Sequence, residues 1–105
     1  MEIFYSNRKL EKLLTNQHAI VKKFGTNDAR HLIGILHQIE YANSLQDIPE
    51  SPRPRRHKLK GELKKYWGIH FSGKNVLVVS PYGEYEIDDL SSMKSIEIIM
   101  IVDYH

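Results

Sequence analysis

Three prolines divide the chain into two halves with different hydrophobic patterns. Pro49, Pro52 and Pro54 lie within residues 43–56, and each ring removes an amide donor and disfavours helix in the residue before it. Ahead of this stretch, apolar residues recur mainly at the spacing of an α-helix, whereas β-branched and aromatic residues dominate after it. The chain is therefore restricted to folds in which a helical layer is followed in sequence by a sheet.

The N-terminal half predicts a short strand and two helices. Residues 1–6 alternate bulky apolar with other residues, which is typical of a strand, and Asn7 is a suitable N-cap for a helix. The first helix is expected to run to Gly25, a natural C-cap, with an apolar face made of Leu10, Leu13, Leu14, Val21 and Phe24. The second starts at residues 26–28 and has an apolar face made of Ala29, Leu32, Ile33, Leu36 and Ile39. We expect an antiparallel helix pair.

The C-terminal half predicts a sheet. Residues 66–72 and 75–80, on either side of a turn at residues 73–74, have the composition of a β-hairpin. Residues 96–102 are almost continuously apolar, which favours a central strand covered on both faces. Residues 81–95 are expected to form an ordered excursion or a flexible loop, with room for a short strand at residues 85–87. The predicted fold is α+β: an N-terminal strand and a two-helix hairpin packed on one face of a small, mainly antiparallel twisted sheet.

Size and composition exclude several classes of protein. A chain of 105 residues forms one hydrophobic core, so residues 1–105 are expected to be a single domain. The sequence has no cysteine, its six histidines lack metal-ligand spacing, and we expect neither a metal nor a cofactor. No apolar run approaches the ~20 residues that span a bilayer, and the first residues do not resemble a signal peptide. A soluble, cytoplasmic protein without membrane contact is expected.

Positive charge is concentrated in one segment. The formal net charge is only +2, but seven of the 15 Lys and Arg residues lie within residues 53–65, where Glu62 is the only acid. Such a cluster suits the phosphates of RNA, although a solvated charged loop is the commoner meaning of a basic run. The RNA-binding hypothesis assigns the contacts to Arg53, Arg55, Arg56, Lys58, Lys64 and Lys65.

Two short segments carry residues suited to acid–base chemistry. His57 and Lys60 lie in the basic segment, where alternation along a strand would direct polar side chains away from the helices. Asp103, Tyr104 and His105 follow directly on the most apolar predicted strand. Two simpler interpretations stay open, namely a histidine in an exposed basic loop and a frayed polar tail.

Together these residues supply what metal-independent RNA cleavage needs. Attack of a ribose 2′-OH on the neighbouring phosphate requires a base for the hydroxyl proton and an acid for the departing 5′-oxygen, and imidazoles suit both roles. Lys60, helped by Lys58 and Arg56, would neutralise the charge that grows on the phosphate. Tyr104 would stack on a base of single-stranded RNA.

The same residues resemble a known family. The pattern H-x-L-K-G at residues 57–61, Y-W-G-I at residues 66–69 and D-Y-H at residues 103–105 are similar to the HigB branch of the RelE/ParE toxin superfamily, and the order of elements agrees along nearly the whole chain. The resemblance implies a bacterial type II toxin that enters the ribosomal A site, cuts messenger RNA and so inhibits translation. It also implies silencing by a helix-turn-helix antitoxin of the HigA type, which alone would link the toxin to operator DNA.

The resemblance also implies roles for individual residues. By position, His57, Lys60, Asp103, Tyr104 and His105 match the family's active-site residues. Asp103 and the two histidines would serve proton transfer, Lys60 would bind the phosphate, and Tyr104 would orient the substrate.

Two features depart from the family pattern. Relatives carry a Trp-Arg pair at the start of the strand after the hairpin turn, where this chain has Asn75 and Val76, so a cationic contact is missing or is supplied by Lys74 or Arg56. Residues 81–95 are also longer than the tight turn typical of HigB. This segment contains four acidic residues, Glu84, Glu86, Asp88 and Asp89. Their side chains would repel RNA and are expected to face away from it.

Two other functions stay open. A ParE-like toxin would share the topology and poison DNA gyrase without a nuclease site, an alternative against which His57 and His105 argue. A non-catalytic module would use the basic segment to bind RNA or an acidic partner, since a fold alone does not fix a function. The remaining histidines are expected to lie at solvated surfaces, and no role is assigned to them. They are His18, His31 and His37 on the helices and His70 on the sheet.

Overall fold

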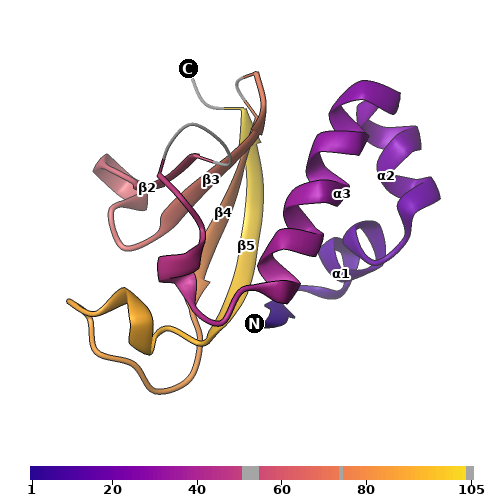
Figure 1. Ribbon diagram of the computed structural model, residues 1–105. Helices are drawn as coiled ribbons and strands as arrows, with labels where there is room; N and C mark the ends of the chain where they lie inside the picture. Colours follow the sequence, from indigo (N-terminus) through magenta and orange to yellow (C-terminus); the bar gives the residue numbers. More distant parts are fainter. Residues whose placement is uncertain (51–54, 74, 104–105) are drawn as a thin grey trace.

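The computed structural model describes residues 1–50, 55–73 and 75–103, which form the α+β architecture expected from the sequence. The helices are α1 (Arg8–Leu14), α2 (Gln17–Phe24) and α3 (Thr26–Tyr41), and short 3₁₀ turns occupy Leu45–Asp47, Gly61–Leu63 and Leu90–Ser92. The strands are β1 (Glu2–Tyr5), β2 (Arg55–Lys58), β3 (Trp67–Ser72), β4 (Asn75–Pro81) and β5 (Ser95–Asp103). Figure 1 shows α1, α2 and α3 together on one side of the sheet.

The strands form one sheet in the order β1-β5-β4-β3-β2. β1 runs parallel to β5, with Glu2 opposite Ser95, whereas the other strand pairs of the described residues are antiparallel. The hairpin predicted at residues 66–72 and 75–80 is confirmed as β3 and β4. The predicted arrangement, helices on one face of a mainly antiparallel sheet, is therefore confirmed.

The hydrophobic core lies between the helices and one face of this sheet. Ile69 of β3, Leu77 of β4 and Ile98 of β5 are fully buried in one cluster with Leu32 and Ile39 of α3. Since successive strand residues point to opposite faces, the residues between these core positions project away from the helices. We call that second surface the outer face of the sheet.

The prediction of one helix from Asn7 to Gly25 is wrong, because the chain breaks into α1 and α2. Asn7 caps α1, as expected, by accepting a hydrogen bond from the backbone N–H of Leu10 at 2.8 Å. Asn16 repeats this arrangement for α2, because its side chain accepts from the backbone N–H of Ala19 at 3.2 Å. A side chain of this type competes with helix continuation, so it ends one helix and starts the next.

Strand β5 confirms the prediction for residues 96–102, and it lies inside the sheet between β1 and β4. The expectation that it is covered on both faces is wrong. Ile96 and Ile98 are fully buried on the core side, whereas Met100 is 36% exposed. A continuous apolar run predicts coverage of both faces, but the outer-face residues of β5 are shielded partly by neighbouring strands and not by a second layer of helices.

Residues 82–94 form an ordered loop and contain no strand at residues 85–87. The backbone N–H of Glu86 donates to the Ser92 hydroxyl at 2.8 Å, and the same hydroxyl donates to the Asp89 carbonyl at 2.7 Å. Met93 is buried, and its carbonyl accepts from the Leu45 backbone N–H at 2.9 Å. These side-chain and backbone bonds replace the strand pairing that the sequence allowed.

The chain's first amino group lies at the end of α3. It donates hydrogen bonds to the carbonyls of Ile39 at 3.0 Å and Glu40 at 2.8 Å, and also to that of Ala42. The last carbonyls of a helix have no partners within it and carry partial negative charge. The Met1 ammonium therefore closes α3 and fixes the start of β1 beside it.

Replacement of Asn16 by alanine tests the helix break. Loss of the bond to the Ala19 N–H should lower the free energy of unfolding by about 1 kcal/mol, as is usual for an N-cap. Urea denaturation measures the loss. Asn27→Ala is the matched control, because Asn27 is exposed in the first turn of α3, a helix without a side-chain cap. Equal stability of the two variants would contradict the capping role of Asn16.

Candidate active site

His57 lies on the outer face of the sheet. On β2 it is opposite Gly68 of β3, which in turn is opposite Val78 of β4 and, through it, Met100 of β5. The next row along the same face contains Arg55, His70, Val76 and Val102. The expectation that His57 projects away from the helix-covered face agrees with this register.

Gly68 makes room for the side chains around His57. A Cβ atom at this position would lie 2.9 Å from Leu59 Cδ2, 2.9 Å from Val76 Cγ1 and 3.2 Å from His57 Cε1. Real Cβ atoms essentially never approach as closely as the first two distances. The imidazole of His57 and the side chain of Leu59 therefore pack directly over the bare backbone of β3.

A second imidazole lies beside the first. The ring centroids of His57 and His70 are 4.9 Å apart, with an angle of 34° between the planes, and both residues are half-buried. The sequence interpretation placed His70 on the sheet surface but assigned it no role. The missing signal was the pairing register of β2 and β3, which brings residues distant in sequence onto one face.

Arg56 and Lys58 lie on the opposite side of β2 from His57. Arg56 is opposite the core residue Ile69, is only 6% exposed, and donates through Nε to the Ile48 carbonyl at 2.7 Å. Its guanidinium is 3.6 Å from a carboxylate oxygen of Glu50 and lies 5.3 Å from the centroid of the Trp67 ring. Arg56 therefore holds the connecting segment against the sheet, which leaves little of it to contact RNA.

Lys58 also has partners within the protein. Its ammonium donates to the carbonyls of Lys64 and Tyr66 and lies 5.7 Å from the centroid of the Trp67 ring. Partial burial lowers the pKa of Lys58. The side chain thus closes the turn between β2 and β3, and its predicted role in neutralising the phosphate gains no support from these contacts.

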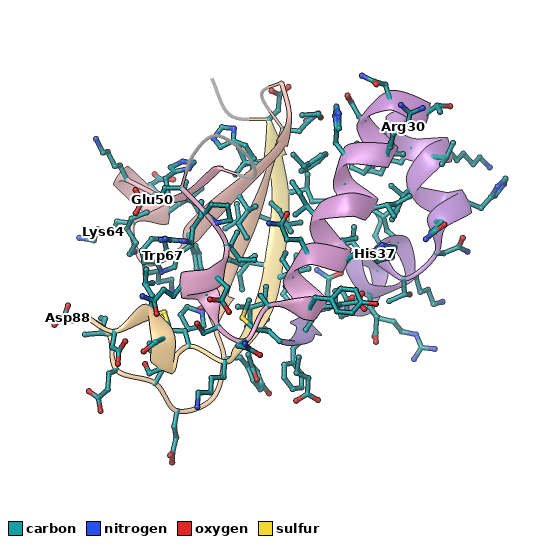
Figure 2. The ribbon with its side chains drawn as sticks, viewed as in Figure 1. Arg30, His37, Glu50, Lys64, Trp67 and Asp88 are labelled. Atoms are coloured by element: carbon teal, nitrogen blue, oxygen red, sulfur yellow. The ribbon has the colours of Figure 1, made fainter. Side chains whose placement is uncertain are left out.

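The other cations of the basic segment are better placed for a partner. Lys60, Lys64 and Lys65 are exposed in the turn between β2 and β3. Figure 2 shows Lys64 pointing outward on the side of the molecule away from His37 and the helices. Arg53 and the side chain of Arg55 lie outside the described residues, and so does Lys74, which was a candidate for the missing cation.

The C-terminal residues of the candidate site are only partly described. Asp103 is exposed at the end of β5, opposite Asn75, whereas Tyr104 and His105 lie outside the described residues. Val102 lies in the same row across the sheet as His70, and this row is next to that of His57. Asp103, the last described residue of β5, comes directly after Val102. The proposed joining of His57 and Lys60 with the chain's last residues stays a prediction.

The two departures from the family pattern have definite positions. Val76 is fully buried on the outer face opposite His70, and its Cγ1 lies 2.9 Å from where a Cβ of Gly68 would stand, so this position presents an aliphatic side chain in place of a cation. The loop with Glu84, Glu86, Asp88 and Asp89 leaves the sheet at the Pro81 end of β4, and Asp103 is at the other end of β5. The acids and Asp103 therefore lie at opposite ends of the sheet.

No three or more His, Cys, Asp or Glu side chains within residues 1–50, 55–73 and 75–103 are grouped so that they could hold a metal ion. No helix in the described part of the chain has the length and apolar character needed to cross a membrane.

Comparison with known proteins identifies the fold. No protein-family model matches the sequence, and no curated protein matches it. A solved structure named YoeB/ParE toxin, from Agrobacterium tumefaciens, is 11% identical with a TM-score of 0.58, and the match covers 100% of this chain and 99% of that one. A YoeB-YefM complex from Staphylococcus aureus contains a chain 15% identical with a TM-score of 0.55, covering 100% of this chain and 97% of that one. The chain therefore has the YoeB/ParE toxin fold over its whole length.

Substitution of Arg56 tests its structural assignment. Arg56→Ala should lower the free energy of unfolding by about 1–3 kcal/mol, because it leaves the Ile48 carbonyl without its donor and removes the cation over Trp67. Lys64→Ala is the control in the same basic segment, and a change at that exposed position should stay within about 0.5 kcal/mol. Thermal or urea unfolding compares the two variants, and equal stabilities would contradict the structural role of Arg56.

Proposed function

We propose that this chain is the toxin of a type II toxin–antitoxin system and that it cleaves messenger RNA on the ribosome. The observation that carries the proposal is the position of His57, which lies half-buried on the outer face of the sheet, in a fold shared along its whole length with YoeB toxins. An imidazole held between packed neighbours but open to one side is suited to proton transfer.

The chemistry follows from the residues assigned to the site. The ribose 2′-oxygen attacks the adjacent phosphorus and loses its proton to a base, while the bond to the 5′-oxygen breaks and that oxygen receives a proton from an acid. The products are a 2′,3′-cyclic phosphate and a 5′-hydroxyl. In this proposal His57, Asp103 and His105 share the proton transfers, Lys60 stabilises charge on the phosphate, and Tyr104 orients the substrate.

Partners follow from the same proposal. The toxin acts in the cytoplasm at the ribosomal A site and is silenced by an antitoxin, which we propose is a helix-turn-helix protein of the HigA type. One of the similar structures is a complex of YoeB with YefM, so a protein of this fold is found bound to a partner protein. The D-Y-H sequence at residues 103–105 supports the HigB subtype, whereas the similar structures bear the name YoeB.

A ParE-like activity against DNA gyrase is the second candidate. It is favoured by the name of one similar structure, a YoeB/ParE toxin. The outer face argues against it, because a gyrase poison would have no use for an imidazole packed over Gly68 at an accessible surface.

Induced expression tests the function directly. Expression without an antitoxin should arrest growth, and mapped transcript ends should show cuts only in regions under translation. His57→Ala should fold normally and lower the cleavage rate by about 10²–10⁴-fold, as does loss of a general acid or base. His37→Ala is the matched control, because His37 is exposed on α3 on the far side of the molecule (Figure 2).

Other outcomes would redirect the proposal. Efficient cleavage of naked RNA would contradict dependence on the ribosome, because correct placement by the ribosome is expected to supply several orders of magnitude in rate. DNA breaks linked to gyrase, without transcript cleavage, would establish the ParE-like alternative. Full activity of His57→Ala would remove this histidine from the mechanism.

The exposed lysines of the turn between β2 and β3 should form a docking surface for ribosomal RNA. Lys64→Ala combined with Lys65→Ala should weaken binding to ribosomes and flatten its salt dependence. With fewer contacts to phosphates, binding releases fewer counterions from the RNA. The matched control combines Lys22→Ala with Lys23→Ala, an equal charge change at two exposed neighbours on α2. Binding measured from low to moderate salt decides, and equal salt slopes for the two double variants would exclude a specific role for the turn.

A further inference from the structure

We propose that His70 is a positioning residue that holds the imidazole of His57 in its working orientation. The inference rests on the proposed function, because it assigns a task within the same site. It starts from the direct contact between the two rings, whose centroids lie 4.9 Å apart with 34° between their planes.

The backbone creates this contact. His57 is opposite Gly68 and Arg55 is opposite His70, so the two histidines are diagonal neighbours on one face of an antiparallel pair. Diagonal neighbours lie within reach of each other when their side chains are aromatic or long. The pairing is therefore set by the register of β2 and β3, which the hydrogen bonds of the sheet fix independently of either ring.

Gly68 directs the His57 ring toward its partner. Because position 68 has no side chain, His57 Cε1 occupies space only 3.2 Å from where a Cβ would stand. Leu59 Cδ2 and Val76 Cγ1 close the other sides of this space at 2.9 Å from the same point. The ring of His57 is thus bounded by aliphatic groups over the β3 backbone and by the imidazole of His70 along the strand.

A bounded ring has fewer orientations open to it, so its nitrogen atoms keep a narrower range of directions. Removal of His70 would open one side of the enclosure and give the His57 ring access to other orientations. A misplacement of about 1 Å is enough to cost on the order of 100-fold in rate, because proton transfer requires aligned donor and acceptor. In this proposal His70 contributes the surface of a planar ring beside His57, so a phenyl ring at position 70 should position His57 equally well.

Three substitutions of His70 separate this role from others. His70→Ala removes the ring, His70→Leu fills the space without a flat surface, and His70→Phe keeps a flat ring that carries no proton. Cleavage by each variant is measured on purified ribosomes programmed with a defined messenger. We expect kcat to fall about 10- to 100-fold for His70→Ala and His70→Leu with KM unchanged, and to stay near wild type for His70→Phe.

Two activity results would overturn the proposal. Wild-type kcat in His70→Ala and His70→Leu would show that the neighbouring ring is dispensable. An equal loss in His70→Phe and His70→Ala would show that His70 acts through its own proton or charge. Gly68→Ala provides an independent test, because its Cβ would stand 2.9 Å from Leu59 Cδ2 and Val76 Cγ1 and 3.2 Å from His57 Cε1, so the side chains that enclose the His57 ring would shift and kcat should fall as well. His37→Ala, an exposed site on α3, is the control for general effects of losing a histidine.

A measurement without RNA keeps the two proposals distinguishable. The ring protons of His57 should experience the ring current of the neighbouring ring, so their NMR shifts should move further in His70→Ala and His70→Leu, which remove that ring, than in His70→Phe, which keeps one. If the wild-type protein cuts no messenger, the proposed function fails, and these shifts still test the contact. Shifts of His57 that all three variants leave unchanged would overturn the positioning role.

Discussion

Helix α3 packs against one face of a twisted sheet, and the outward position of His57 and His70 depends on that contact. Leu32 and Ile39 on the helix meet a row of aliphatic residues that includes Ile69, Leu77 and Ile98. Because strand residues alternate between faces, burial of this set decides which side chains of β2 and β3 point outward. A shift of one residue in the pairing of β2 would exchange the faces of His57 and Arg56.

The basic segment illustrates how a sheet divides a charge cluster. Read along the sequence, Arg56, His57 and Lys58 form one run of positive or protonatable residues. In the structure, Arg56 and Lys58 face Trp67 and bind backbone carbonyls, which fastens the connecting segment and the turn to the sheet. His57 alone of the three faces outward, and the lysines beyond it remain exposed. One run of sequence thus serves both as an anchor and as a candidate site.

The sequence predicted the parts of the fold that depend on local pattern. Periodic apolar residues in α3, the β3–β4 turn and the strand character of β5 were sufficient for the layer arrangement. The break at Asn16 was missed because the same apolar stripe continues across it, so only the competing side-chain bond marks the boundary. The burial of Arg56 and the contact of His70 with His57 were missed for another reason. Both depend on the register of β2 against β3, and no local pattern in either strand encodes it.

The parallel pairing of β1 with β5 has a consequence for how the molecule is assembled. Glu2 meets Ser95, so nearly the whole chain lies between partners that bond in the finished sheet. Contacts of such long sequence separation form late, since loop closure must precede them. During synthesis, β2, β3 and β4 can pair as a meander, but β1 has no partner until β5 has left the ribosome. The strand that leads to Asp103 is thus also the one that joins the two parts of the sheet. The sheet of this domain therefore stays incomplete until residues 95–103 have been synthesised.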